Sequence, residues 1–161
     1  MAPIMHIEAL YSTESTGVGV GSAVEVRVVL AYESLSAALR AADAIAILHC
    51  QAREGVAVRL SPWSFAALEN PQWRLLAALE VARAEMIMLA SCNATQRLSA
   101  GIERWLKASL ARRHPTPFAV AALFNHGGSP DHPETPRMQS VRRLAQEAGC
   151  EFIASQPNGE W

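Results

Sequence analysis

Lysine and cysteine are scarce in this chain of 161 residues. Lys107 is the only lysine, so arginine supplies nearly all of the 14 basic residues. Cys50, Cys92 and Cys150 are odd in number, lie far apart and form no Cys-x-x-Cys pair. This pattern argues against a disulfide framework and against a cysteine-based zinc site, and it predicts a reducing, cytoplasmic environment.

Long apolar runs and an excess of one charge are also missing. The chain has no run of about 18 consecutive apolar residues, and its N-terminus lacks the basic stretch and apolar block of a signal peptide. Acidic residues number 15, and the formal net charge is −1. Because nothing here attracts a polyanion, we expect neither nucleic acid nor a membrane among the partners.

The common ligand-binding motifs are absent as well. The sequence contains neither G-x-G-x-x-G nor a Walker P-loop, which excludes the usual nucleotide cradles. His126, Asp131 and His132 could be imagined as metal ligands, but they lie in a stretch rich in Gly and Pro without further ligands nearby. An exposed loop is the better interpretation, and no metal site is expected.

What the chain does contain is enough apolar material for one folded domain. Half of its residues are hydrophobic and 18% are charged, which suits a single core at this length. Residues 1–23 are rich in Ser, Thr and Gly and are expected to form a flexible N-terminal segment. Within it, Ile4 to Tyr11 is apolar enough to dock on the domain. We expect residues 24–161 to form that single domain.

Strand and helix signals alternate through this domain. Apolar, β-branched or uninterrupted runs predict strands at 24–32, 56–60, 84–90, 117–124 and 150–154. Helices are expected between them, beginning after the capping residues Ser34 or Ser36, Asn70, Ser99 and Thr135. Pro71 and Pro136 follow two of these caps at the first helical position. Ser61 to Phe65 is expected to be a turn or a single helical turn, and Gly55 and Gly149 are expected to end two of the helices.

Apolar spacing predicts which side of each helix faces the core. In the helix after Asn70, the residues expected to face inward are Leu75, Leu76, Leu79 and Ala82. In the helix after Ser99 they are Ile102, Leu106 and Leu110. In the first helix, the residues near helical spacing are Leu35, Leu39, Ala42, Ile45 or Ala46, and Leu48.

The alternation predicts an α/β three-layer fold with a five-stranded parallel sheet. We favour the flavodoxin-like strand order 2-1-3-4-5, with 3-2-1-4-5 as the alternative, and four helices with no C-terminal helix. In the favoured order only the first helix covers one face, which leaves apolar surface over strands 3 to 5. Exposure there would cost about 25 cal/mol per Å². A partner subunit or the N-terminal segment is therefore expected to cover it, whereas the alternative order leaves no such gap.

The architecture resembles that of response-regulator receiver domains. Their phosphorylation needs acidic residues after strand 1, an aspartate at the end of strand 3 and a lysine after strand 4. Here strand 3 ends in Ser91-Cys92-Asn93 and strand 4 in Phe124-Asn125-His126, and Glu33 is the only acidic residue at that edge. One carboxylate holds magnesium poorly, so phosphoacceptor chemistry is excluded.

The stretch from Ala84-Glu85 to Trp105 resembles flavin-dependent reductases of the flavodoxin-like group. That resemblance implies a flavin, FMN, held by the loop after the first strand. The matching loop, Glu33-Ser34-Leu35-Ser36, offers two hydroxyls but no glycine, together with a carboxylate that would repel phosphate. The usual tyrosine, glycine and lysine of the reductase loop are missing too.

Ligands of open α/β sheets bind outside the carboxyl ends of the strands. The candidate ligand-binding residues are therefore Ser34, Ser36, Ser91, Cys92, Asn93, Asn125 and His126. Cys92 is a candidate nucleophile with His126 as its base, although a packed structural thiol is the commoner role for cysteine.

Taken together, the sequence favours a non-catalytic regulatory or protein-interaction module without a cofactor, acting as a homodimer with a protein partner still to be identified. The alternative is a small-molecule or flavin-binding enzyme, with FMN as its cofactor. Its site would lie at the carboxyl ends of strands 1, 3 and 4.

Overall fold

The computed structural model describes residues 24–51, 55–93, 95–112, 117–124 and 134–154. The expected N-terminal segment, residues 1–23, lies outside these ranges. So do Asn125, His126 and the possible metal ligands that follow them, and residues 155–161, where the absence of a C-terminal helix was expected. None of the described helices is long and apolar enough to cross a membrane.

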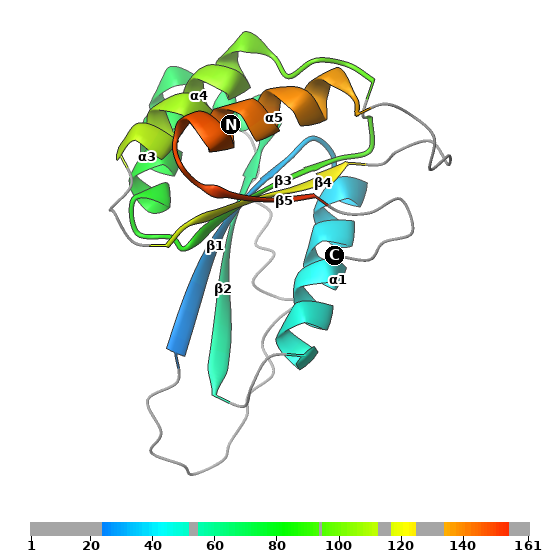
Figure 1. Ribbon diagram of the computed structural model, residues 1–161, viewed down its shortest axis with the longest axis vertical. Coiled ribbons are helices and arrows are strands. Elements are labelled where there is room, and N and C mark those ends of the chain that lie inside the picture. Colours follow the sequence, from blue (N-terminus) through cyan, green and yellow to red (C-terminus); the bar gives the residue numbers. More distant parts are fainter. Residues whose placement is uncertain (1–23, 52–54, 94, 113–116, 125–133, 155–161) are drawn as a thin grey trace.

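The core element is a five-stranded sheet in which every neighbouring pair is parallel (Figure 1). The order is β2-β1-β3-β4-β5, which confirms the favoured flavodoxin-like arrangement. The strands are β1 (Val24–Tyr32), β2 (Val56–Ser64), β3 (Met86–Ser91), β4 (Ala119–Phe124) and β5 (Glu151–Ala154).

The helices begin where their capping residues predict. They are α1 (Leu35–Gln51), α2 (Phe65–Leu68), α3 (Pro71–Val81), α4 (Ala100–Arg112) and α5 (Pro136–Glu147). The residue just before each long helix caps it, because its side-chain oxygen accepts a hydrogen bond from a backbone N–H of the first turn. The capping residues and the donor–acceptor distances are Ser34 (3.3 Å), Asn70 (2.9 Å), Ser99 (3.2 Å) and Thr135 (3.3 Å). Gly55 and Gly149 both have positive φ, and Gly149 at 67° ends α5 as a left-handed cap.

The second strand is longer than expected. Ser61 to Ser64 continue β2 in register with β1 instead of forming a turn, and the single helical turn α2 follows. Pro62 lacks an N–H, but β2 is an edge strand with a neighbour on one side only. A proline is tolerated at such an edge, where no second neighbour requires its N–H.

The two faces of the sheet are covered unequally. Helices α3, α4 and α5 lie over one face with α2 and build the larger core, in which Trp105, Phe124 and Ile87 are at most 2% exposed. On the other face, α1 is the only described helix, and it packs against β1, β2 and β3 (Figure 1). This unequal coverage was expected from the strand order.

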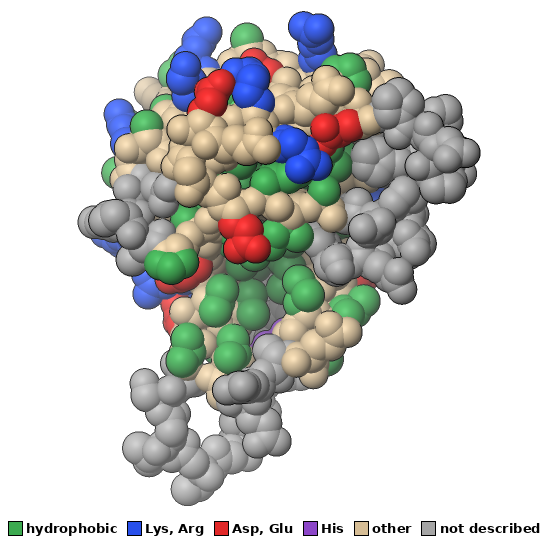
Figure 2. Space-filling model, in the orientation of Figure 1, with side chains coloured by type: hydrophobic (Ala, Val, Ile, Leu, Met, Phe, Trp, Pro, Cys, Tyr) green, Lys and Arg blue, Asp and Glu red, His purple; other side chains and the backbone are tan. Residues whose placement is uncertain are grey.

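Most apolar side chains that β3 and β4 present on the α1 side are buried. Met88, Ala121 and Leu123, on the inner strands β3 and β4, are only 1%, 1% and 6% exposed. At the amino end of the sheet, β1 and β2 project beyond β3, because β1 pairs with β2 from Val24 but with β3 only from Val28. Hydrophobic side chains gather on this projecting pair of strands beside α1 (Figure 2).

The inward-facing sides of α1 and α3 also differ from the expected ones. Leu75, Leu76 and Leu79 are about half exposed, and the buried residues of α3 are Ala77, Ala78 and Val81. Likewise α1 exposes Leu35 and Leu39 and buries Ala37, Ala38, Ala41, Ala42 and Ala44. Small side chains let both helices approach the sheet closely, so the leucines are left on the outer sides. In α4, by contrast, Ile102, Leu106 and Leu110 are buried as expected.

Candidate functional site

Three of the candidate residues meet at the carboxyl edge of the sheet. Ser34 and Ser36 lie at the start of α1, with their Oγ atoms 3.0 Å apart. The Sγ atom of Cys92, just after β3, is 3.4 Å from Ser36 Oγ and 3.8 Å from Ser34 Oγ. Arg40, one turn further along α1, points Nη1 at the same sulfur from 3.9 Å. We call these four residues the Cys92 cluster.

The surroundings of Cys92 favour the thiolate. The hydrogen bond with Ser36 lowers the pKa of the thiol, burial opposes this, and Ser34 and Arg40 lower it further, so the pKa lies below its ordinary value. The side chain is exposed, so a reagent can reach it. The cluster supplies hydroxyls and a guanidinium but no general base, and the base proposed from the sequence, His126, lies outside the described residues.

A second polar group at this edge of the sheet is centred on a buried arginine. Arg137 of α5 is 3% exposed. Its Nη1 lies 3.2 Å from Glu33 Oε1 and also donates to Ser91 Oγ, while Nε and Nη2 donate to the carbonyls of Gln96, at 2.9 Å, and Arg97, at 3.4 Å. The Ser91 hydroxyl donates in turn to Glu33 Oε2. Arg137 thus joins the ends of β1 and β3 to the segment before α4.

The charge of Glu33 is compensated within the protein. Burial raises the pKa of this carboxyl, but the hydrogen bond from Ser91, the positive charge of Arg137 and the backbone N–H of Asn93 together hold the pKa below its ordinary value. The carboxylate is therefore committed to Arg137. The sequence-based expectation that it would repel a phosphate at this edge overlooked that partner.

Ser91 and Asn93 make structural contacts. Ser91 is fully buried at 0% exposure and holds Glu33 and Arg137. Asn93 forms a local turn, in which its Oδ1 accepts the backbone N–H of Thr95 at 3.1 Å and the Thr95 hydroxyl at 2.8 Å. Of the seven residues, the structure brings Ser34, Ser36 and Cys92 together, and it does not describe Asn125 or His126.

Sequence reasoning missed Arg40 and Arg137. Arg137 did leave a signal, because it precedes Val141 by four residues and Leu144 by seven and so falls on the apolar stripe of α5. A charged residue at such a position needs a buried partner. Arg40 left no comparable signal, since its role depends on the proximity of Cys92 across 52 residues.

No other described feature forms a compact site. An open groove of about 540 Å³ between α4 and α5 is lined by residues of both charges, among them Arg97, Glu103 and Arg143. Arg143 is already paired with Glu147 at 3.0 Å. The described residues contain no group of three His, Cys, Asp or Glu side chains placed to hold a metal ion.

Comparison with known proteins finds only distant structural neighbours. No family model matches the sequence, and no curated protein matches it. Among solved structures, similar chains include a flavodoxin from Streptococcus pneumonia TIGR4 (TM-score 0.49, 12% identity, 81% of this chain and 82% of that one). A second is a flavodoxin from the domain Archaea (TM-score 0.47, 17% identity, 82% of this chain and 85% of that one). A third is an azoreductase from Bacillus anthracis str. Sterne (TM-score 0.44, 10% identity, 83% of this chain and 88% of that one).

At these identities and TM-scores the neighbours say nothing of what this chain binds. The flavodoxin-like fold follows from the parallel strands and their order, and its function has to be argued from the site and the surfaces.

Proposed function

We propose that this protein is a non-catalytic protein-interaction module that forms a homodimer through α1. The observation that supports this most directly is the exposed apolar side of that helix. Leu35, Leu39 and Ile47 are 55%, 46% and 56% exposed, and we call these three side chains the α1 surface. Apolar side chains that gather on one element of a folded domain often mark an interaction site.

The order of side chains along α1 favours a second copy of the chain as the occupant. Leu35, Leu39, Ala46 and Cys50 are exposed and follow helical spacing along one side of α1, with large residues in its first half and smaller ones in its second. If two copies pack antiparallel, Leu39 of one lies against Ala46 of the other. Large side chains then meet small ones, as helix packing requires.

The charges on α1 also permit self-association. The helix carries one arginine, Arg40, one aspartate, Asp43, and His49 near its end. Arg40 faces Cys92, so Asp43 is the one acidic group that two copies bring together. A surface with so little charge can face itself with little like-charge repulsion.

The test compares the mass in solution of three proteins by light scattering. We expect the wild type to have twice the monomer mass of 17.4 kDa and Leu39→Glu to be monomeric, because the substitution buries a carboxylate in the interface. Leu79→Glu, a matched change on α3 over the opposite face of the sheet, should remain dimeric. A monomeric wild type, or a dimer lost only in Leu79→Glu, contradicts the proposal.

A second candidate function rests on the Cys92 cluster. An exposed thiol whose pKa is lowered suits a reactive thiolate, and the two hydroxyls and the guanidinium beside it suit a small anionic ligand. FMN, the cofactor named from the sequence, is one such ligand. Titration of FMN fluorescence tests it directly, and unchanged fluorescence at micromolar protein rejects FMN.

The lowered pKa of Cys92 makes a prediction about pH. Because the thiolate is the reactive form, alkylation of Cys92 by iodoacetamide should begin at lower pH than that of a free cysteine, and Ser36→Ala should move its midpoint upward. Mass spectrometry of the Cys92 peptide measures the rate at each pH. If Ser36→Ala leaves the midpoint unchanged, the hydroxyl does not stabilise the thiolate.

A further inference from the structure

A second apolar surface lies on α3. Leu75, Leu76 and Leu79 are 52%, 48% and 55% exposed, and helical spacing places them on one side of the helix. Arg83 follows two residues after the end of the helix at Val81. We call these three leucines the α3 surface. It lies over the opposite face of the sheet from α1 (Figure 1), so a homodimer built on α1 leaves it open.

The back of α3 is fixed in place. Ala77, Ala78 and Val81 pack into the main core with exposures of 0–4%. At the flank, Glu80 accepts a hydrogen bond from Trp63 Nε1 at 2.8 Å and one from the Ser61 hydroxyl, both on β2. A helix held in this way presents its leucines on a rigid support, which lowers the entropic cost of binding.

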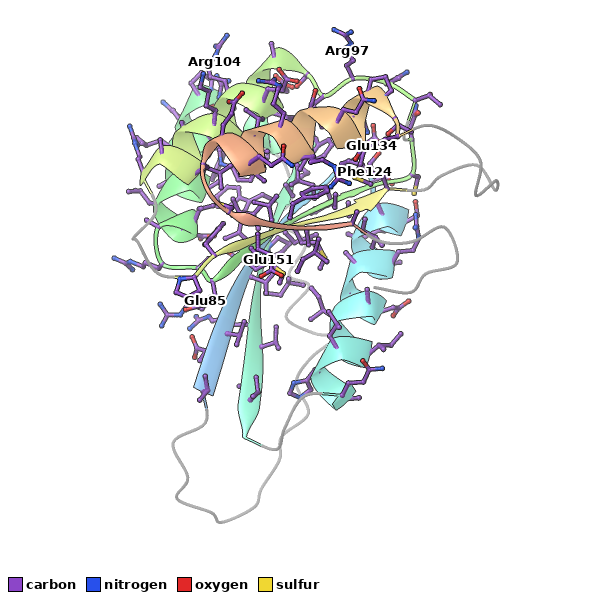
Figure 3. All side chains as sticks on the ribbon, viewed as in Figure 1. Glu85, Arg97, Arg104, Phe124, Glu134 and Glu151 are labelled. Atoms are coloured by element: carbon purple, nitrogen blue, oxygen red, sulfur yellow. The ribbon has the colours of Figure 1, made fainter. Side chains whose placement is uncertain are left out.

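The charges around the α3 surface differ from those of the whole chain. Helix α4 packs beside α3, and together they carry two acidic residues, Glu80 and Glu103, and four basic ones, Arg74, Arg104, Lys107 and Arg112. Arg104, Lys107 and Arg112 are exposed, as is Arg83 just beyond the end of α3, and Figure 3 shows Arg104 pointing outward from α4. This region is basic although the chain as a whole has a net charge of −1.

We propose that the α3 surface binds an amphipathic helix of a protein partner, one whose apolar stripe is bordered by acidic residues. Leucines at successive turns suit the apolar stripe of a docked helix, and the arginines and lysine of α3 and α4 suit carboxylates beside that stripe. The binding depends on neither the dimer nor the Cys92 cluster.

A membrane is the other occupant that basic and apolar residues could suit. Three leucines on a helix of 11 residues offer much less than the long amphipathic helices that lie in bilayers. Acidic residues also stand at the amino ends of the strands, at Glu25, Glu85 and Glu151. A peptide helix needs only the narrow strip that α3 and α4 provide.

The experiment measures fluorescence anisotropy of two labelled helical peptides titrated with the full-length protein. Both have leucines at alternating three- and four-residue spacing; one has glutamates beside that stripe and the other has lysines. We expect the glutamate peptide to bind saturably in the micromolar range and the lysine peptide at least about tenfold more weakly. Equal binding of both, or no saturable binding of the glutamate peptide, overturns the proposal.

Variants show whether the peptide occupies the α3 surface. Leu79→Glu should weaken the binding of the glutamate peptide by about tenfold or more. Arg83→Glu should weaken this binding less, and Leu39→Glu on α1 should leave it unchanged. Circular dichroism confirms that each variant is folded. Binding that survives Leu79→Glu, or attachment to phosphatidylserine vesicles without peptide binding, contradicts the proposal. Because Leu39→Glu tests the dimer separately, failure of one proposal is distinguishable from failure of the other.

Discussion

At the scale of single residues, the most constrained side chain is Arg137. It is almost fully buried, and its three nitrogens reach a carboxylate, a hydroxyl and two backbone carbonyls. These partners lie at the ends of β1 and β3 and in the segment before α4. One guanidinium therefore links these three segments at the carboxyl edge of the sheet. The fixed fork of donors explains why arginine and not lysine occupies the position.

Replacing this side chain should be costly. Arg137→Met leaves the carbonyls of Gln96 and Arg97 without their donor and Glu33 without its counter-charge, and we expect a loss of about 2–3 kcal/mol in the free energy of unfolding. Arg143→Met removes an exposed pair on the same helix and should cost less than about 0.5 kcal/mol. Urea unfolding measures both, and equal losses would contradict the role assigned to Arg137.

The candidate site shows what a sequence can and cannot predict at this scale. The sequence placed Ser34, Ser36 and Cys92 at one edge because the carboxyl ends of parallel strands meet there, and the structure brings them into contact. It did not predict that Ser91 would be buried beneath Arg137, or that Arg40 would reach Cys92. Both depend on side-chain directions across distant segments, which composition and spacing do not specify.

At the scale of elements, helix starts were predictable and inward-facing sides were not. A capping side chain acts on its own first turn, so Asn70 and Thr135 mark helix starts whatever surrounds them. Which side of α1 or α3 is buried depends on how closely the helix approaches the sheet. Both helices bury alanines and expose leucines, which reverses the usual inference from apolar spacing.

Because α1 packs closely on the sheet through alanine side chains, larger side chains at these positions should destabilise the protein. Ala41 is 0% exposed against the sheet, so Ala41→Leu should overpack this contact and lower the free energy of unfolding by about 1–3 kcal/mol. Ala108→Leu, at an exposed position of α4, should change it by less than about 0.5 kcal/mol. Thermal or urea unfolding compares the two. If Ala41→Leu is as mild as Ala108→Leu, α1 does not approach the sheet closely.

At the scale of the whole molecule, the strand order was predictable because alternating strands and helices with right-handed crossovers leave few topologies. The unequal covering of the two faces followed from that order. The projection of β1 and β2 beyond β3 did not follow from it, because the strand order does not specify how long each strand is.

Two apolar surfaces on opposite sides of the sheet are the basis of the protein's proposed role. Of the nine large hydrophobic side chains exposed among the described residues, four lie on α1, four on α3, and Val24 begins β1. In our account α1 joins two copies while α3 holds a partner helix, so each dimer presents two partner sites. Isologous pairing through α1 closes the assembly at two copies.

Cysteine cross-linking across α1 tests the self-association most directly. In a Cys50→Ser, Cys92→Ser background, antiparallel pairing places the two copies of Asp43 beside the two-fold axis and the two copies of Leu35 about 22 Å apart. With a short bismaleimide, we predict that Asp43→Cys yields a covalent dimer while Leu35→Cys and the background protein do not. The absence of a covalent dimer from Asp43→Cys, or equal cross-linking at both positions, would contradict the account.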